Sequence, residues 1–325
     1  MTTVTRLPLC LATGILLAGL IPVSAAKNEA AADPAKVDVD YAFQGEYAGL
    51  LAGQFDVGAQ VIALGDGKFK LVLYPGGLPG AGYDSTSEKR EYDGARDGDT
   101  VTFTGGTTGK SITGSKLTFS LDGQESAIDR TIRKSPTLGA KPPEGALVLF
   151  DGKSAENFKP GRMTESGLLM QGANSVKKFQ SHKLHIEFRL PYEPTKRGQA
   201  RGNSGCYMQA RYEVQMLDSF GLAGKHNECG GIYTIADPDV NMCLPPLQWQ
   251  TYDIDFTAAK YDKDGKKTAN ARATVRHNGV LIHDNIELPK RTTASPLAEG
   301  PEAGFLHLQD HGNQVRYRNI WVVEK

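Results

Sequence analysis

The sequence has 325 residues, of which 37 are acidic and 37 are basic, so its formal net charge at pH 7 is zero. A chain without excess positive charge lacks the basic face that nucleic-acid binding requires, which argues against that class of function. Its 37 glycines and 8% aromatic residues favour a β-rich globular protein with many loops over a helical one.

The first 26 residues differ from the rest of the chain. One early basic residue, Arg6, precedes an apolar stretch that ends in small residues. This order is typical of a secretory signal peptide (1–26), with cleavage after Ala25 or Ala26. The apolar run is interrupted and short for a membrane span. The sequence therefore predicts a secreted or periplasmic protein with no membrane span in the mature chain.

Residues 27–40 are rich in alanine and charge and are predicted to form a mobile leader. A β-rich accessory domain is expected over residues 41–134. Its clearest element is a hairpin, in which the apolar runs 61–64 and 69–74 flank the turn Gly65-Asp66-Gly67. This domain is expected to be a scaffold, with carbohydrate binding as the alternative.

Residues 135–146 contain several prolines and are predicted to be a stiff linker. The second domain, residues 147–325, again consists of short strands separated by turn signals, which indicates a β-sandwich. In residues 184–190, the apolar side chains alternate with His185, Glu187 and Arg189.

Four cysteines are present, and one of them, Cys10, falls in the predicted signal peptide. In an oxidising compartment, Cys229 and Cys243 could form a disulfide across a long loop, which would leave Cys206 as a buried free thiol. Other pairings are also compatible with the sequence. The cysteine spacings match no usual zinc pattern.

Polar residues of a few chemical kinds recur on one face of several predicted strands of the second domain. Amide and carboxylate side chains bind sugar hydroxyls well, because each supplies paired donors or acceptors in one plane. These residues predict either a groove that binds carbohydrate or an ordinary solvated sheet face. They are Glu187, Arg189, Gln209, Glu213, Gln215 and His311.

Several motifs of the second domain occur in an order that resembles one known family. They include GNSGCYMQARYEVQMLDSFG (202–221), VRHNGVLIHDNIEL (275–288) and LQDHGNQVRYRNIWV (308–322). Together they are similar to the 3-keto-disaccharide hydrolase family, over about residues 147–323. Cys206 stands where the family pattern usually has an aliphatic residue.

The resemblance implies an all-β fold, namely a concanavalin A-like jelly-roll sandwich, here preceded by a smaller β-rich domain. It also implies an enzyme that cleaves 3-keto-glycosides. The 3-keto group acidifies the proton on C2, a base removes that proton, the C1 leaving group departs, and water then adds back. The resemblance further implies a divalent metal ion that stabilises the enolate.

The roles expected from the resemblance fall into two groups. Glu213 is the first candidate for the base or a metal ligand, and His311 is the second candidate for proton transfer and metal binding. The residues expected to line the substrate pocket are Glu187, Asn203, Tyr207, Gln209, Gln215, Gln309, Asp310 and Arg316. Asp310 is also expected to orient His311.

Two other functions fit the same sequence. A non-catalytic carbohydrate-binding module is the main alternative, because jelly rolls serve as lectins as well as enzymes. An ordinary glucanase ranks last, because Gln215 occupies a position where such an enzyme needs a carboxylate. The expected partner in each case is a carbohydrate, and the sequence indicates no particular oligomeric state.

Overall fold

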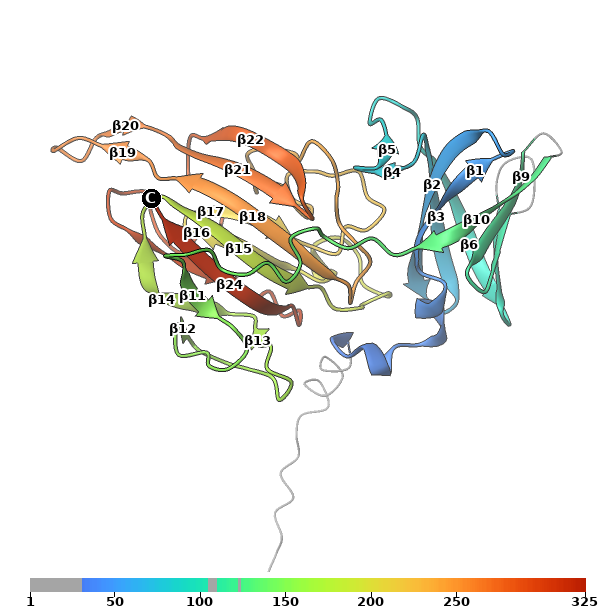
Figure 1. Ribbon diagram of the computed structural model, residues 1–325, viewed down its shortest axis with the longest axis horizontal. Coiled ribbons are helices and arrows are strands. Elements are labelled where there is room, and N and C mark those ends of the chain that lie inside the picture. The colour runs from blue at the N-terminus through green and yellow to red at the C-terminus, as the bar shows by residue number, and fades with distance from the viewer. Residues whose placement is uncertain (1–30, 105–109, 122–123) are drawn as a thin grey trace, which may run out of the picture.

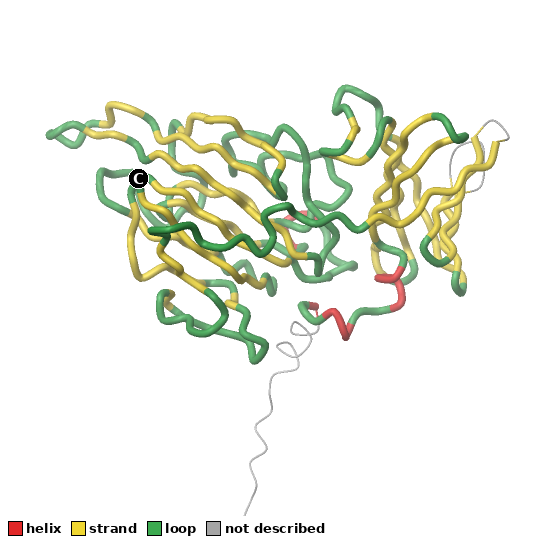
Figure 2. Tube along the Cα trace, viewed as in Figure 1, coloured by secondary structure: helices red, strands yellow, loops and turns green. Residues whose placement is uncertain are grey.

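Two β-structured units follow one another along the chain in the computed structural model, which describes residues 31–104, 110–121 and 124–325 (Figures 1 and 2). The predicted signal peptide lies outside these residues. The predicted fold class, a β-sandwich of the jelly-roll type preceded by a smaller β-rich domain, is confirmed. None of the helices in the described ranges is long and apolar enough to cross a membrane.

The first unit is a closed eight-stranded barrel. Its strands are Gly45–Leu51 (β1), Phe55–Gly65 (β2), Lys68–Pro75 (β3), Arg90–Asp97 (β6), Thr100–Thr104 (β7), Lys110–Thr113 (β8), Lys116–Leu121 (β9) and Gln124–Thr131 (β10). They are hydrogen-bonded in the order β1-β10-β9-β8-β7-β6-β3-β2. The predicted hairpin is confirmed as β2 and β3. A short parallel pair, Leu78–Pro79 (β4) and Gly82–Tyr83 (β5), lies outside the barrel.

The second unit is a sandwich of two antiparallel sheets. The seven-stranded sheet comprises Leu147–Phe150 (β11), Leu169–Met170 (β13), His182–Arg189 (β15), Trp249–Thr257 (β18), Ala271–His277 (β21), Val280–Leu288 (β22) and Arg316–Glu324 (β24). The five-stranded sheet comprises Phe158–Lys159 (β12), Ala173–Phe179 (β14), Ser204–Met208 (β16), Tyr212–Met216 (β17) and Gly304–Leu308 (β23).

The strand order in the seven-stranded sheet is β11-β24-β15-β18-β21-β22, with β13 also paired to β24, and in the five-stranded sheet it is β12-β14-β23-β16-β17. A separate hairpin is formed by Lys260–Tyr261 (β19) and Lys267–Ala269 (β20), and the 3₁₀ helices are Pro34–Lys36 (η1), Val39–Ala42 (η2) and Gly198–Ala200 (η3).

Alternation along each strand determines which side chains fill the space between the two sheets. Ile186 and Phe188 of β15 and Val214 and Met216 of β17 belong to one buried apolar cluster. Their polar neighbours must therefore point to the outer face of each sheet, because successive side chains of a strand point to opposite faces. The sandwich thus has two polar outer faces on opposite sides of its core.

The barrel packs directly on the sandwich. Ile62, Val72 and Tyr74 of the barrel belong to the same apolar cluster as the sandwich core. Arg201 forms a buried ion pair with Asp218, at 2.6 Å, and also donates a hydrogen bond to the Ala63 carbonyl of the barrel. The two units are therefore joined by an apolar contact and by hydrogen bonds.

The described part of the predicted leader also packs on the sandwich. The Ala31 carbonyl accepts a hydrogen bond from the backbone of Tyr192. The Tyr192 hydroxyl donates to Asp38, and Arg189 donates to the Ala32 carbonyl. These contacts place the described part of the leader on the sandwich, and its mobility stays a prediction.

The predicted linker lies across the outer face of the seven-stranded sheet (Figure 1). Ser135 and Thr137 hydrogen-bond to Thr251 of β18, and Thr137 also donates to Asp253. The same segment continues to β15 and β24: the Gly139 amide donates to Glu187 at 2.5 Å, and the Ala140 carbonyl accepts hydrogen bonds from Asn319 and Trp321. The linker is therefore part of the packed structure.

The predicted disulfide between Cys229 and Cys243 is absent, since both are buried free thiols, as is Cys206. Cys229 and Cys243 hydrogen-bond to each other. Cys229 also lies 3.2 Å from the Tyr252 hydroxyl, and Cys243 donates to the Leu217 carbonyl. The thiols of Cys229 and Cys243 thus have hydrogen-bond partners that compensate for their burial.

Candidate active site

A straight row of four polar side chains crosses the outer face of the five-stranded sheet. Asn174 of β14 is paired with His307 of β23, His307 with Tyr207 of β16, and Tyr207 with Glu213 of β17. Directly opposed residues on one face of an antiparallel sheet bring their Cβ atoms to about 5 Å, close enough for their side chains to interact. The strand register therefore assembles this site from four chain segments.

Hydrogen bonds and ring contacts connect the row. Nδ1 of His307 lies 2.6 Å from Oδ1 of Asn174, and the rings of His307 and Tyr207 have centroids 5.0 Å apart. The Tyr207 hydroxyl donates to the Glu213 carboxylate and accepts a hydrogen bond from Gln309, whose Nε2 lies 3.1 Å away. A continuous chain thus runs from the partly exposed Gln309 to the buried Glu213.

Glu213 supplies the carboxyl group of the row, and its pKa is shifted far from the ordinary value. Its residue is 2% exposed, and this burial raises its pKa to about 8, while the hydrogen bond from Tyr207 acts in the opposite direction. Burial also lowers the pKa of His307, to about 4, so that its imidazole is neutral at pH 7. A carboxyl group that titrates near neutral pH can accept and release protons under physiological conditions.

Amide side chains extend the site along β17. Nε2 of Gln215 lies 3.2 Å from Oε1 of Gln199, and Asn203 donates to the backbone carbonyl and to the side chain of Gln199. Asn203 and Gln215 are buried, whereas Gln199 is partly exposed. The structure therefore brings Glu213, Tyr207, Gln215, Asn203 and Gln309 together on one sheet face, as the sequence predicted.

Three of the remaining predicted residues have structural partners elsewhere. Gln209 ends β16 with a positive φ and donates hydrogen bonds to the Phe179 carbonyl and to the Gln180 side chain, so it fixes a turn and does not line the site. Glu187 and Arg316 lie on the opposite outer face, on β15 and β24 of the seven-stranded sheet. The single groove expected from the sequence is thus wrong, because the polar strands belong to two different sheets.

Glu187 is buried under the linker. It accepts hydrogen bonds from Arg318, Asn319 and the Gly139 amide. Burial alone would raise its pKa, but these bonds and one from His185 lower the pKa of Glu187 to about 2. Its carboxylate therefore stabilises the docked linker and is not available to a substrate.

The predicted residues Asp310 and His311 lie in the exposed loop after β23. Asp310 forms a 3.4 Å ion pair with Arg162 and accepts a hydrogen bond from the Gly312 amide, so it does not orient His311 through a hydrogen bond. His311 is exposed. This loop follows Gln309 directly and therefore lies at the solvent end of the hydrogen-bond chain that leads to Glu213.

Two residues of the row, His307 and Asn174, were missed by the sequence analysis. His307 lies between Leu306 and Leu308, so the alternation in that strand already placed it on the polar face. Asn174 precedes a run without clear alternation, and only its pairing with His307 reveals its position.

The donor set around Glu213 does not fit a divalent metal ion. Its hydrogen-bonded neighbours are a phenol and, beyond it, an amide, so Glu213 would be a lone carboxylate ligand. Within the part of the chain that the structure describes, no group of three or more His, Cys, Asp or Glu side chains could hold a metal. We therefore derive no chemical step through a metal.

Gly205 accommodates the Glu213 carboxyl group. A Cβ atom at this position would overlap Oε1 of Glu213 and would lie 2.7 Å from Cε2 of Tyr207. We expect Gly205→Ala to displace the carboxyl group and to destabilise the protein by about 1–3 kcal/mol, as overpacking does. Urea unfolding would measure the loss.

A double-mutant cycle tests the cause of that loss. In a Glu213→Ala background the nearer obstacle, the carboxyl group, is gone and only the Tyr207 ring remains, so Gly205→Ala should cost less than in the wild type. An equal cost in both backgrounds would mean that the glycine is required for another reason.

Comparisons with known proteins agree with this architecture. Residues 145–323 match the model of a family described as 3-keto-alpha-glucoside-1,2-lyase-like domain, which begins after the barrel. A solved structure from Parabacteroides distasonis, described as a "putative glycosyl hydrolase", is 31% identical and covers 56% of this chain and 85% of its own, with a TM-score of 0.51. A second one from the same organism and with the same description is 20% identical, covers 56% of this chain and 94% of its own, and has a TM-score of 0.41. Among curated proteins, none matches this chain significantly.

Proposed function

The chain belongs to the family of 3-keto-alpha-glucoside-1,2-lyase-like domains, and from this premise we propose that it is an exported enzyme that cleaves glycosides oxidised at C3 of the sugar. Membership of this family indicates a carbohydrate-active protein with a glycosidase-like domain. Cleavage of a 3-keto-glycoside in particular is supported by one observation, the buried Glu213, whose pKa is raised to about 8.

The proposed reaction needs one base and no pair of catalytic carboxylates. The 3-keto group acidifies the C2–H bond, and the Glu213 carboxylate takes that proton. The electron pair left on C2 forms a double bond to C1, and the bond from C1 to the leaving oxygen breaks. Water then adds across the new double bond, so the net reaction is hydrolysis.

The other polar groups have roles that fit their positions. The Tyr207 hydroxyl donates to the Glu213 carboxylate and accepts a hydrogen bond from Gln309, so it holds the base in place. The exposed His311 is suited to protonating the leaving oxygen, because histidine is the side chain that most often serves as a general acid. His307, Gln309 and Asn174 are partly exposed and can bind sugar hydroxyls.

Access to Glu213 requires a local movement, because the residue is 2% exposed. The segment Gly231–Tyr233 is hydrogen-bonded to β17: the Gln215 amide donates to the Gly231 carbonyl and the Tyr233 amide to the Glu213 carbonyl. We propose that this segment opens to admit the sugar. Its opening would break these backbone hydrogen bonds and would move the buried Ile232.

Turnover of matched substrates tests the proposal. The purified protein would be incubated with a methyl glucoside and with its 3-keto counterpart, and release of methanol would be measured. We expect release from the keto form only. Binding of either sugar without turnover would favour the carbohydrate-binding module, and release from the unmodified glucoside would favour an ordinary glycosidase. The same assay after removal of divalent ions tests the metal that the family resemblance implies.

A further inference from the structure

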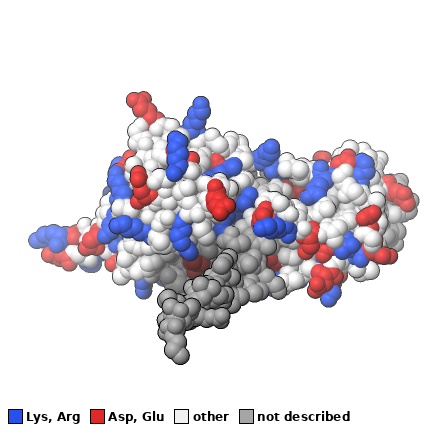
Figure 3. Space-filling view, turned by 90° about the horizontal axis from the view of Figure 1, so that it is seen from below, with Lys and Arg blue, Asp and Glu red and all other residues white. Residues whose placement is uncertain are grey.

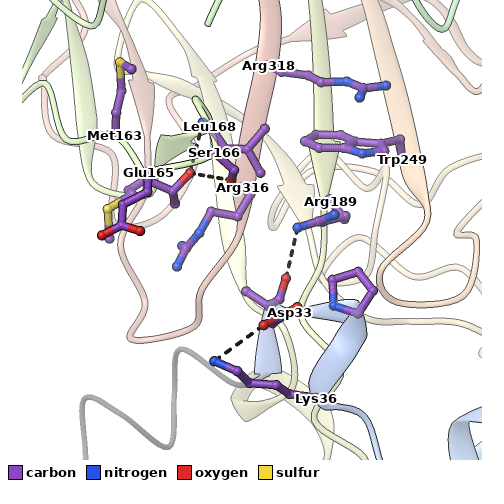
Figure 4. A pocket seen from close by; sticks show the side chains of 14 residues that line it. Asp33, Lys36, Met163, Glu165, Ser166, Leu168, Arg189, Trp249, Arg316 and Arg318 are labelled. Carbon is purple, nitrogen blue, oxygen red and sulfur yellow. Dashed lines mark hydrogen bonds and ion pairs between the residues drawn. The ribbon is translucent and has the colours of Figure 1, made fainter.

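A second cavity lies on the opposite face of the sandwich from Glu213. It has a volume of about 850 Å³ and is formed between β15, β18 and β24, the loop Met163–Met170 and the segment Ala32–Lys36 (Figure 4). This size is within the range of sites that bind small organic ligands. The function proposed above does not use it.

Three aligned side chains form one wall of this cavity. The Trp249 ring lies between two guanidinium groups, with Arg318 at 4.1 Å and Arg189 at 5.1 Å from the ring centroid (Figure 4). The register explains this arrangement, because Arg189 is paired with Trp249 on one side and with Arg316 on the other. Stacking on an aromatic face fixes a guanidinium in place and leaves its N–H edge available to a ligand.

The two stacked arginines are held by few partners. Nε of Arg318 donates to Glu187 at 2.6 Å, and one terminal nitrogen of Arg189 donates to the Ala32 carbonyl at 2.9 Å. Among the described residues, the buried Nε of Arg189 has no hydrogen-bond partner. Burial, and then the positive charge of Arg318, lower the pKa of Arg189, and a bound anion would offset both effects.

The guanidinium of Arg189 favours an anion. In the lining, Asp33 is already paired with Lys36, and Arg318 is paired with Glu187. Arg189 has no such carboxylate partner among the described residues, and its buried Nε has no hydrogen-bond acceptor. On the face of the molecule seen in Figure 3, charges of both signs are interspersed.

The rest of the lining suits a sugar ring. The hydroxyl groups of Thr164 and Ser166 and the apolar side chains of Met163, Leu168 and Met170 form the opposite wall. Hydroxyl groups can bind ring hydroxyls, and apolar side chains can pack on the C–H face of a pyranose. An inorganic anion would fill only a small part of 850 Å³.

We propose that this cavity is a second carbohydrate site, which binds an acidic sugar through its carboxylate or sulfate group. The anionic group would lie against the guanidinium edges of Arg189 and Arg318, since the arginine fork matches such oxyanions in a bidentate manner. The site is separate from the candidate active site, so binding here does not depend on turnover there.

Calorimetric titration of the full-length protein tests this inference. The probes are methyl glucuronoside, glucose 6-sulfate, methyl glucoside and inorganic sulfate. We expect at least one of the two acidic sugars to bind at least tenfold more tightly than methyl glucoside and than inorganic sulfate. The ratio between the two acidic sugars distinguishes a carboxylate site from a sulfate site.

Variants locate the binding. Arg189→Lys keeps the positive charge but removes the planar pair of guanidinium N–H donors, and Trp249→Phe keeps an aromatic face. Both variants should fold. Arg189→Lys should bind the acidic sugar about tenfold or more weakly. Arg272→Lys, at an exposed arginine of the same sheet, and Glu213→Gln should leave binding unchanged. Equal affinity for acidic and neutral sugars, tightest binding by sulfate alone, or unchanged binding by Arg189→Lys would each overturn the proposal.

Discussion

Replacing Glu213 with glutamine is expected to lower the turnover of a 3-keto-glycoside by about 10²–10⁴-fold, the usual contribution of a general base. Glutamine has nearly the same shape and can accept the hydrogen bond from Tyr207, but it cannot take a proton from C2. The measurement is kcat/KM for release of the leaving group, compared with the wild type.

The control for this variant is Glu302→Gln, which changes an exposed carboxylate and should leave turnover unchanged. Tyr207→Phe is a second comparison. It removes a hydrogen bond that lowers the pKa of Glu213, so the pH at which activity reaches its plateau should rise. Full activity of Glu213→Gln would contradict the assignment of the base.

The pH dependence of activity and that of stability have opposite signs at Glu213. Only the deprotonated form acts as a base, so kcat/KM should rise with pH, be half-maximal near pH 8 and level off above that pH. The folded pKa exceeds the ordinary value of 4.5, so between about pH 4.5 and 8 the native state binds more protons than the unfolded state. Stability attributable to this group is therefore lost as the pH rises through that window, by at most about 1.4 kcal/mol per pH unit. Glu213→Gln should abolish this loss.

Replacing Glu187 with alanine is expected to reduce the free energy of unfolding by about 1–3 kcal/mol, because the change leaves buried hydrogen-bond donors unpaired, while the Arg318 side chain, 38% exposed, can be solvated by water. The change leaves Arg318, Asn319 and the Gly139 amide without their shared acceptor. His185, which is stacked on Trp321 at 5.0 Å, loses one of its two carboxylate neighbours. Urea unfolding of the full chain measures the effect.

The matched control is Glu287→Ala, on the same sheet, where both partners of the ion pair with Arg272 are exposed and the cost should be below about 1 kcal/mol. Limited proteolysis at residues 135–146 provides a second readout, because a released linker is cut faster. The folded pKa of Glu187 is lowered to about 2, so its stabilisation is present above about pH 4.5 and is lost as the pH falls toward 2. The variant should lack this acid sensitivity, and a variant as stable as the wild type would exclude a role in linker docking.

The polar and apolar alternation of the strands could be predicted from the sequence, because it depends only on neighbouring residues. It correctly separated Tyr207, Glu213 and Gln215 from the core. A turn also depends only on neighbouring residues, so the hairpin of β2 and β3 was expected from its Gly-Asp-Gly turn.

The pairing of distant strands could not be predicted in the same way. Glu187 and Glu213 show the same alternation, yet β15 and β17 belong to different sheets, so the two carboxylates lie on opposite faces. His307 and Asn174 join the site only through their register with Tyr207. The prolines of the linker indicated stiffness, but not the surface on which the segment lies.

The docked linker has a consequence for how this protein can be divided. A fragment that begins at the family boundary, residue 145, would lack the linker partners of Thr251, Asp253 and Glu187 and would expose these groups to more water. It would also lose the barrel residues that complete its apolar cluster. The glycosidase-like half is therefore not an autonomous module, and swapping or trimming experiments should keep the chain from residue 31 onward intact.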